Sequence, residues 1–308
     1  MLIFAHHNAA EFIREIESAL AQRSPDLVEQ RRAFARANTW RARGEELMPL
    51  AQACFPKASI VIVTYHNREL NRECIQSLYE RTEWPNFEVF VVDNASTDGT
   101  PEMLRAVEGK YPGLTVMLNE QNLGFAKANN QALQQATGEY LVLLNNDTVV
   151  TRGWLTGLIR HLAADEYLGV VGPVTNEIGN EAKIPVGYQQ LADMPRWARH
   201  HVREHDGELL DLPMLAMFCI AIRRTVFSAI GELDERFGIG MFEDDDYSYR
   251  IRHAGLKTQC AQDVFIHHHG QASFKMMTEA EYRGLFEENR RRYEEKWGEP
   301  WVSHSARS

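Results

Sequence analysis

The chain has 308 residues, enough for one large domain or two modest ones, and it can bury a core without metal or disulfide staples. Hydrophobic residues make up 44% and charged residues 25%, which excludes a disordered, collagenous or coiled-coil protein. The formal net charge of −10 argues against a nucleic-acid partner, because phosphate contacts need a basic face.

The four cysteines stand apart without a CxxC pair, so we predict neither a disulfide framework nor a thiolate metal site, and a cytoplasmic protein. No apolar run approaches the roughly 20 residues of a membrane span, and the first twelve residues lack the pattern of a signal peptide. Peripheral association with the inner face of the membrane stays open, since an enzyme that acts on a lipid-linked acceptor can dock through a small surface.

The first part of the chain, from residue 9 to about residue 55, has apolar residues at three- and four-residue spacing, which is typical of helices. We expect Pro25 to break this segment and Pro56 to end it, before the composition changes to a β-rich run. We therefore predict a helical N-terminal segment over residues 1–57 that carries no chemistry. It fits a spacer, a docking arm or the end of a preceding module in a larger multi-domain enzyme.

Strands and helices are expected to alternate after this boundary. The strands are nearly continuous apolar runs, which a parallel sheet covered on both faces requires. The pattern predicts an α/β, Rossmann-like domain with a mostly parallel central sheet and helices on both faces. The expected strands are 59–65, 87–93, 114–119 and 139–145, and the expected helices are 70–80, one after Pro101, and 125–137.

The alternation loosens after residue 154. We expect a polar loop over 176–211 and an amphipathic helix over 279–297. The predicted domain covers residues 58–275, and a C-terminal helix and tail cover 276–308. Between these we expect a helix at 154–163, a strand at 169–172, an apolar run at 214–222, a helix at 223–230, a helix ending at His253 and a strand running into His267.

Polar residues end each of the four predicted strands. Ligands of an open parallel sheet bind beyond the carboxyl ends of its strands, so these residues are expected to share one rim. Turn chemistry alone would place Asn, Asp and Gly at any one of these ends, but four polar ends together favour a ligand site. They are Thr64-Tyr65-His66-Asn67, the run from Asp93 to Gly99, the run from Asn119 to Asn122, and Asn145-Asn146-Asp147.

The first strand is not followed by G-x-G-x-x-G or by G-x-x-x-x-G-K-[ST], which argues against a dinucleotide-dependent dehydrogenase and a P-loop NTPase. An Asp at a strand end can instead accept a hydrogen bond from a base or a ribose. A bound diphosphate would need a cation, most simply Mg²⁺ or Mn²⁺ held by a carboxylate such as Asp147.

Four consecutive acids, Glu243 to Asp246, follow the glycine-containing stretch 237–240. A helix N-terminus favours acidic residues, but four exceed what capping needs. Their mutual repulsion is expected to raise the pKa of some of them, and a carboxylate beside an acceptor hydroxyl is suited to general-base chemistry.

Three histidines, His267 to His269, are expected at the end of a strand. Alternation puts His267 and His269 on one face and His268 on the other, so only part of the triplet can enter one site. We predict a metal or phosphate contact. A zinc hydrolase is disfavoured, because neither H-E-x-x-H nor three convergent histidines are evident. The other histidines at positions 6, 7, 200, 201 and 205 are expected on the surface.

Several strings, in this order, resemble family 2 glycosyltransferases of the GT-A fold over about residues 59–274: SIVIVTYHNRELNRECIQSL, FEVFVVDNASTDGT, NLGFAKANNQAL, GEYLVLLNNDT, FEDDDYSYRIRHAG and IHHHG. The resemblance implies an inverting enzyme that uses a UDP- or dTDP-sugar and a divalent metal, Mn²⁺ or Mg²⁺. The acceptor would be a hydroxyl of a glycan or a lipid-linked molecule, in the synthesis of bacterial surface polysaccharide.

The resemblance also implies roles for single residues. Asn145-Asn146-Asp147 occupies the Asp-x-Asp position, with an amide where the family often has the first carboxylate. Asp147 would face the metal, completed by His267 as first choice or His269. Asp244 would be the catalytic base, with Glu243 or Asp245 orienting the acceptor. The nucleotide-binding residues would be Thr64, Tyr65, Asn67, Asp93, Asn122, Gly124, Phe125, Lys127 and Asn146.

Two rival functions are compatible with parts of the sequence. A nucleotidyltransferase normally has a glycine-rich, basic loop after the first strand, which YHNREL is not. A catalytically weak module that binds a sugar nucleotide or a glycan is suggested by Asn145, whereas the retained FEDDD run argues for catalysis.

Overall fold

The structure is a computed structural model that describes residues 9–21, 24–270 and 278–303. It divides into two compact units, Met1–Cys54 and Phe55–Ser308. Within the described residues, no helix combines the length and the hydrophobicity needed to cross a bilayer.

The first unit is helical, as the sequence predicts. Pro25 starts a helix here rather than merely breaking one, because it occupies the first turn behind the N-cap Ser24, whose hydroxyl accepts a hydrogen bond from the Leu27 amide. The first two helices bury none of their residues. The helices are α1 (Ala9–Ala21), α2 (Pro25–Ala37) and α3 (Trp40–Cys54).

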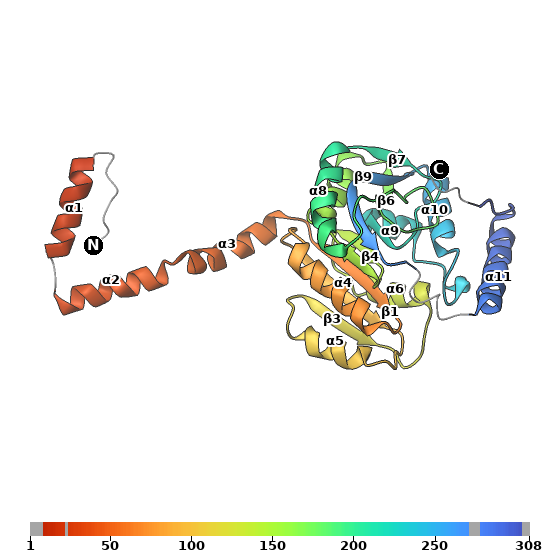
Figure 1. The fold of residues 1–308 in the computed structure, drawn as a ribbon, viewed down its shortest axis with the longest axis horizontal. Helices are drawn as coiled ribbons and strands as arrows, with labels where there is room; N and C mark the ends of the chain where they lie inside the picture. The colour runs from red at the N-terminus through yellow and green to blue at the C-terminus, as the bar shows by residue number, and fades with distance from the viewer. Residues whose placement is uncertain (1–8, 22–23, 271–277, 304–308) are drawn as a thin grey trace. The chain divides into compact units, whose positions relative to one another are not determined.

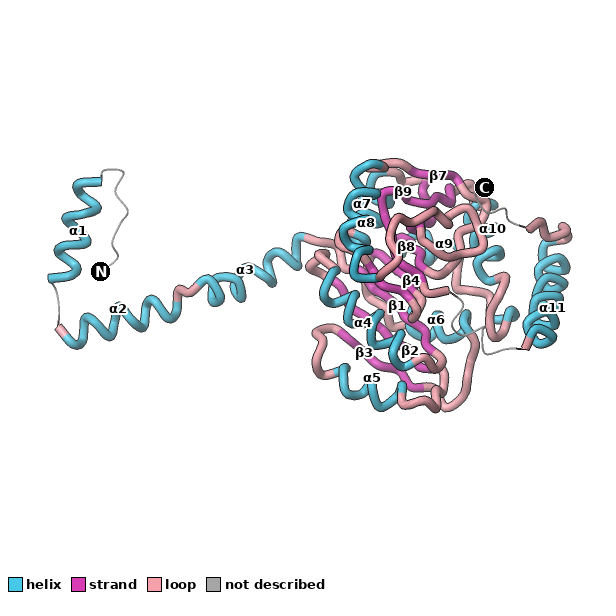
Figure 2. The backbone as a smooth tube through the Cα atoms, viewed as in Figure 1, coloured by secondary structure: helices cyan, strands magenta, loops and turns pink. Residues whose placement is uncertain are grey.

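The second unit is built on a sheet (Figures 1 and 2). Among the described residues its strands run in the order β3-β2-β1-β4-β8-β6-β9-β5, with β7 beside β9. The β1–β2, β2–β3, β1–β4 and β6–β9 pairs are parallel, which confirms the predicted mostly parallel sheet. β8 runs antiparallel to both β4 and β6. The strands are β1 (Ala58–Thr64), β2 (Phe87–Asp93), β3 (Leu114–Leu118), β4 (Tyr140–Leu144), β5 (Thr148–Val150), β6 (Leu168–Val174), β7 (Leu209–Asp211), β8 (Cys219–Arg223) and β9 (Lys257–His268).

Helices cover both faces of this sheet, as the apolar strands predict. Alternation along β1 sends Ile60 and Ile62 into one core and Val61 into the other. The first core takes side chains from α4 (Arg68–Arg81), α5 (Thr100–Glu108) and α7 (Trp154–Ala164). The second takes them from α6 (Phe125–Leu133), α8 (Met194–Glu204), α9 (Arg224–Ile230) and α10 (Glu243–His253).

The region 176–211 is not the loop that the sequence predicts. It contains a short 3₁₀ helix, η1 (Leu191–Asp193), then α8 and β7. α8 forms because Met194, Trp197 and Ala198 recur at helical spacing and pack on the second core. His201, expected on the surface, lies against this core edge, with its Nε2 2.9 Å from the Gln262 carbonyl oxygen.

The C-terminal helix α11 (Glu279–Trp297) belongs to the second unit. It begins at a capping box formed by Thr278 and Glu281. Its inner side contacts the second 3₁₀ helix, η2 (Glu235–Phe237), and the segment that leads into α10.

Candidate active site

The carboxyl ends of β1, β2 and β4 meet at one edge of the sheet. Thr64 is in register with Asp93 across the β1–β2 pair. The Asn146 side-chain amide, which follows β4, donates to Thr64 Oγ1 at 3.1 Å and to Asn71 Oδ1 at 2.9 Å. Three residues predicted to bind nucleotide are thus brought together. Asn146 acts inside the protein by holding the Thr64 side chain. The sequence analysis does not single out Asn71, a polar residue on the buried side of α4.

Asp93 is the buried carboxylate of this edge and is 1% exposed. Its Oδ2 accepts a hydrogen bond from the Ser96 amide at 3.0 Å. Its Oδ1 is buried and has no hydrogen-bond partner among the described residues. Because a buried polar atom without a partner costs free energy, this oxygen is suited to accept a hydrogen bond from a ligand.

Backbone strain gathers around the same edge. Every non-glycine residue with positive φ in the described part of the chain follows β1, follows β2 or directly precedes α10. Such conformations cost about 1–3 kcal/mol each and cluster at functional sites. The five residues are His66, Asn67, Ala95, Met241 and Phe242.

The segment before α6 links this edge to α10. Gly124 accepts a hydrogen bond at its carbonyl from the Asn94 side chain at 3.1 Å, and its amide donates to Asn122 Oδ1 at 2.9 Å. The Phe125 amide donates to the Ile239 carbonyl at 3.2 Å. The chain just before the acidic run therefore rests on the segment predicted to lie beside the nucleotide. Of the remaining predicted nucleotide residues, Tyr65 is half-buried and Lys127 is exposed.

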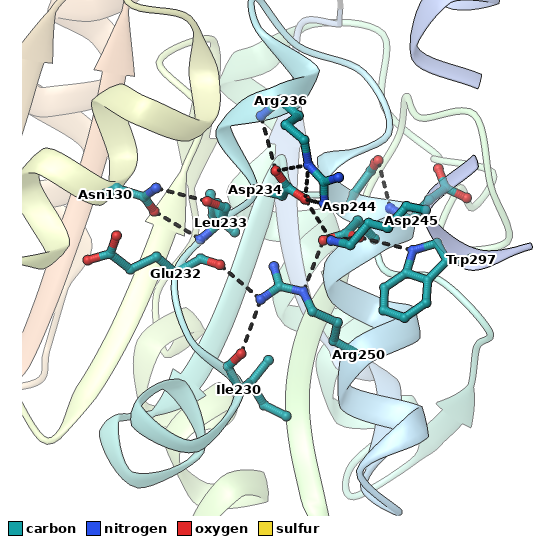
Figure 3. Close-up of polar contacts among 12 residues, drawn as sticks. Asn130, Ile230, Glu232, Leu233, Asp234, Arg236, Asp244, Asp245, Arg250 and Trp297 are labelled. Carbon is teal, nitrogen blue, oxygen red and sulfur yellow. Dashed lines mark hydrogen bonds and ion pairs between the residues drawn. The ribbon is translucent and has the colours of Figure 1, made fainter. Parts of the chain in front are cut away.

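The four acids at the start of α10 divide into different environments. Asp246 is fully buried and is compensated by Lys296 Nζ at 2.5 Å and by Arg250 Nε at 2.9 Å. Figure 3 labels Arg250. Asp245 accepts a hydrogen bond from Trp301 Nε1 at 2.8 Å. Glu243 and Asp244 stand at the start of the helix, where the macrodipole favours negative charge.

Glu243 is buried, and its Oε2 has no hydrogen-bond partner among the described residues. Burial, together with the neighbouring charge of Asp244, raises the pKa of Glu243 from 4.5 to about 8. Asp244 Oδ1 accepts a hydrogen bond from the Asp245 amide at 3.0 Å. Glu243 thus retains a proton at neutral pH beside a second carboxylate, an arrangement suited to proton transfer.

The histidine that contacts Asp147 is His268, and not His267 or His269 as expected. His268 Nε2 lies 3.1 Å from Asp147 Oδ1, and both side chains are buried. His267 Nδ1 contacts the Tyr188 hydroxyl at 2.6 Å, and His269 Nε2 contacts Glu73 at 2.9 Å. The β5–β9 pairing, continued by the hydrogen bond from the His269 amide to the Asp147 carbonyl at 2.9 Å, brings Asp147 to this end of β9, where alternation separates His268 from His267 and His269.

The pKa values of His267 and His268 are shifted in opposite directions. Burial, and then the charges of His269 and His268, lower the pKa of His267 to about 4. Burial also favours the neutral form of His268, but contacts with Asp147 and the Glu177 carbonyl outweigh it and raise the pKa of His268. Within the described ranges, no group of three or more His, Cys, Asp or Glu residues could hold a metal ion. Asp147 and His268 are candidates for two ligands of a cation, which would take its other ligands from phosphate oxygens and water.

The contact between the α6 segment and residue 238 can be tested at Gly124. A Cβ at Gly124 would overlap the Gly238 carbonyl, whereas one at Gly153, which has a similar φ of 80°, would meet nothing within 4 Å. We expect Gly124→Ala to lower the free energy of unfolding by about 1–3 kcal/mol more than Gly153→Ala does. Urea denaturation of both variants measures the difference. Equal losses would contradict the close approach.

The raised pKa of Glu243 predicts a pH-dependent stability. The folded state keeps this proton up to about pH 8, while the unfolded chain releases it above about pH 4.5. Stability therefore falls as pH rises between these values, by up to about 1.4 kcal/mol per pH unit for this group. Glu243→Gln should remove that slope, so its stability relative to wild type should increase from pH 5 to pH 8 in denaturant titrations. Glu102→Gln, on the exposed side of α5, is the control and should track wild type; a Glu243→Gln curve parallel to wild type would refute the assignment.

Comparison with known proteins adds to this geometry. The model of glycosyl transferase family 2 matches residues 59–231. The O-antigen biosynthesis protein RfbC of Myxococcus xanthus is 30% identical over 239 residues, which are 74% of this chain and 18% of that protein. The N-acetylglucosaminyl-diphospho-decaprenol L-rhamnosyltransferase of Mycobacterium tuberculosis is 25% identical over 237 residues, 68% of this chain and 75% of that protein.

A solved structure has a similar fold. The mannosyltransferase PcManGT from Pyrobaculum calidifontis, in complex with GDP-Man and Mn²⁺, is 25% identical and has a TM-score of 0.54, covering 71% of this chain and 58% of that one. The second unit has the GT-A fold. With the family model matching more than half of its residues, the chain belongs to glycosyl transferase family 2.

Proposed function

We propose that the chain transfers a sugar from a UDP- or dTDP-linked donor to a hydroxyl of a glycan or lipid-linked acceptor, with inversion at the anomeric carbon. The observation that carries this proposal is that, at one sheet edge of a family 2 chain, Thr64 lies in register with Asp93 and accepts a hydrogen bond from Asn146. The contact from Phe125 to Ile239 ties the segment before Glu243 to the same edge.

The nucleoside half of the donor would bind beyond β1 and β2. Asp93 Oδ1 is buried, has no partner among the described residues, and would accept a hydrogen bond from the base or the ribose. Tyr65 follows Thr64 and offers an aromatic ring at the same edge. Residues from the start of α4 and the α6 segment would complete this pocket: Asn67, Asn122, Gly124, Phe125 and Lys127.

The transfer itself needs one displacement. Asp244 would take the proton of the acceptor hydroxyl as its oxygen attacks the anomeric carbon, and the bond to the diphosphate breaks with its electron pair on the leaving group. Glu243, protonated at neutral pH because burial raises its pKa to about 8, would donate a hydrogen bond that orients the acceptor. Asp245 is held by Trp301 and would support the position of Asp244. A single displacement inverts the configuration.

Asp147 and His268 are the residues that would hold a divalent metal, Mn²⁺ or Mg²⁺. The ion, when bound, would neutralise the negative charge that develops on the departing diphosphate. Tyr188 and Glu73 contact His267 and His269, so these two histidines would support the site from the other face of β9.

The relatives favour this function and suggest its setting. RfbC is a protein of O-antigen biosynthesis, and the mycobacterial relative is a rhamnosyltransferase whose named acceptor is a decaprenol-linked sugar. PcManGT was solved with GDP-Man and Mn²⁺. We therefore propose that this chain acts in surface polysaccharide synthesis in the cytoplasm, at the inner face of the membrane, as part of a longer enzyme.

A catalytically weak sugar-nucleotide-binding module is the second candidate. It is favoured by Asn145, an amide where the family often has a carboxylate. Such a module would bind a donor without breaking it, so turnover separates the two functions.

The base assignment is tested by donor turnover. A thermal-shift screen of UDP-, dTDP- and GDP-sugars with Mn²⁺ identifies the preferred donor, because a ligand of the folded state raises apparent stability. We expect wild type to hydrolyse that donor slowly, and Asp244→Asn to lose about 10²- to 10⁴-fold in rate while still binding it. Asp206→Asn, whose side chain is 72% exposed, is the control. Equal turnover by wild type and Asp244→Asn would defeat the base assignment, and binding without turnover by wild type would favour the second candidate.

The metal assignment is tested by binding alone. With Mn²⁺ present and UDP, dTDP or GDP near 100 times its dissociation constant, the total stabilisation of wild type by the nucleotide should reach about 2.7 kcal/mol. Asp147→Asn should lose most of the part that requires Mn²⁺ and keep the metal-independent part. Asp193→Asn, an exposed carboxylate before α8, should behave as wild type. Unchanged Mn²⁺ dependence in Asp147→Asn would place the cation elsewhere.

A further inference from the structure

One buried side chain stands out on the charged helix α11. Asn289 is 0% exposed and is the buried residue of that helix. Its amide donates to the carbonyl oxygens of Phe237 at 2.7 Å, Gly240 at 2.8 Å and Met241 at 3.2 Å. Arg292 Nη1 fixes the orientation of this amide by donating to Asn289 Oδ1 at 3.0 Å. A single side chain thus satisfies three carbonyls of the loop 237–242.

The same loop has a backbone that needs support from outside. Met241 and Phe242 both adopt left-handed conformations, with φ of 76° and 74°. Strained backbone of this kind persists only where the surroundings over-determine it. The Phe242 ring, which is buried, packs on Phe286, Tyr293 and Trp301, with centroid distances of 5.2, 5.9 and 5.3 Å.

Charged and polar contacts also join α11 to α10, the helix that follows this loop. Lys296 Nζ lies 2.7 Å from Asp234 and 2.5 Å from Asp246. Trp297 Nε1 donates to Asp246 at 3.0 Å, and Arg250 holds the other oxygen of the same carboxylate (Figure 3). Side chains of α11 therefore contact the chain both before and after Glu243 and Asp244.

We propose that Asn289 is a positioning residue for sugar transfer, acting through the backbone of loop 237–242 to set the carboxylates of Glu243 and Asp244. This inference rests on the proposed function. The loop touches the donor side as well, because the Phe125 amide donates to Ile239 and Gly124 lies against Gly238. Asn289 thus fixes the distance between the proposed base and the nucleotide segment.

Replacing Asn289 should lower the turnover number, kcat. A misplacement of about 1 Å in a reacting group can cost about 10²-fold in rate. Donor binding rests on β1, β2 and the α6 segment, which Asn289 does not contact. We therefore expect kcat to depend on Asn289 and KM for the donor to depend on it little.

The first test replaces Asn289 by leucine, which has similar branching and no donor. With the donor identified by the screen and Mn²⁺, Asn289→Leu should lower kcat for hydrolysis by about 10- to 100-fold and change the donor KM by less than about threefold. Arg291→Ala is the matched control on the same helix, because Arg291 pairs only with exposed Glu295 in the contacts observed and should leave both constants unchanged.

A second variant and a second measurement cover the case in which Asn289→Leu does not fold. Arg292→Ala removes the partner that orients the Asn289 amide, from a side chain that is 35% exposed. Its kcat should fall by about three- to tenfold. Amide hydrogen exchange of either folded variant should accelerate in residues 237–246 and stay unchanged in β1 and β2.

The outcomes separate the two proposals. Wild-type kcat in the folded variants, or an equal change of kcat and KM, would overturn the positioning role of Asn289 and leave the proposed function standing. Unchanged exchange in residues 237–246 would overturn it as well. A wild-type protein that turns over none of the donors would defeat the proposed function itself, and the role of Asn289 with it.

Discussion

The burial of negative charge governs the second unit, because removing a carboxylate from water costs several kcal/mol unless partners compensate for it. Asp246 is compensated fully, by Arg250, Lys296 and Trp297. Asp93 and Glu243 are buried as well, but each keeps one oxygen without a partner among the described residues. This difference separates Asp246, which supports the fold, from Asp93 and Glu243, which we propose to meet a ligand. The linear sequence presents all of them alike.

Much of the fold and of the sheet edge could be predicted from local patterns. Apolar runs that end in Thr64, Asp93 and Asn145 define strands whose carboxyl ends must meet once the strands are parallel. The histidine triplet could be predicted only in part. Alternation separates His268 from its neighbours, but the approach of Asp147 to this end of β9 depends on the β5–β9 pairing, which joins residues more than a hundred positions apart.

The sequence analysis does not predict two other features, for different reasons. The helical spacing of Met194, Trp197 and Ala198 was present in the sequence, and the many charged and histidine residues around it obscured a helix that packs on the second core. The acidic run was recognised, but the separate environments of its members were not predictable. Asp245 and Asp246 are bound by Trp301 and Lys296, which lie about fifty residues further along the chain.

The part of the second unit that matches the family model and the part that follows it differ in what holds them. The family model ends at residue 231, so it contains the sheet edge proposed to bind the nucleotide but neither the acidic run, the histidines nor α11. The strained residues Met241 and Phe242 lie in this later part and are held by side chains of α11. A change in that helix can therefore move the start of α10 while the β1, β2 and β4 ends stay bonded to one another. The proposed nucleotide contacts and the proposed base therefore rest largely on different bonds, and the contact from Phe125 to Ile239 joins the two parts.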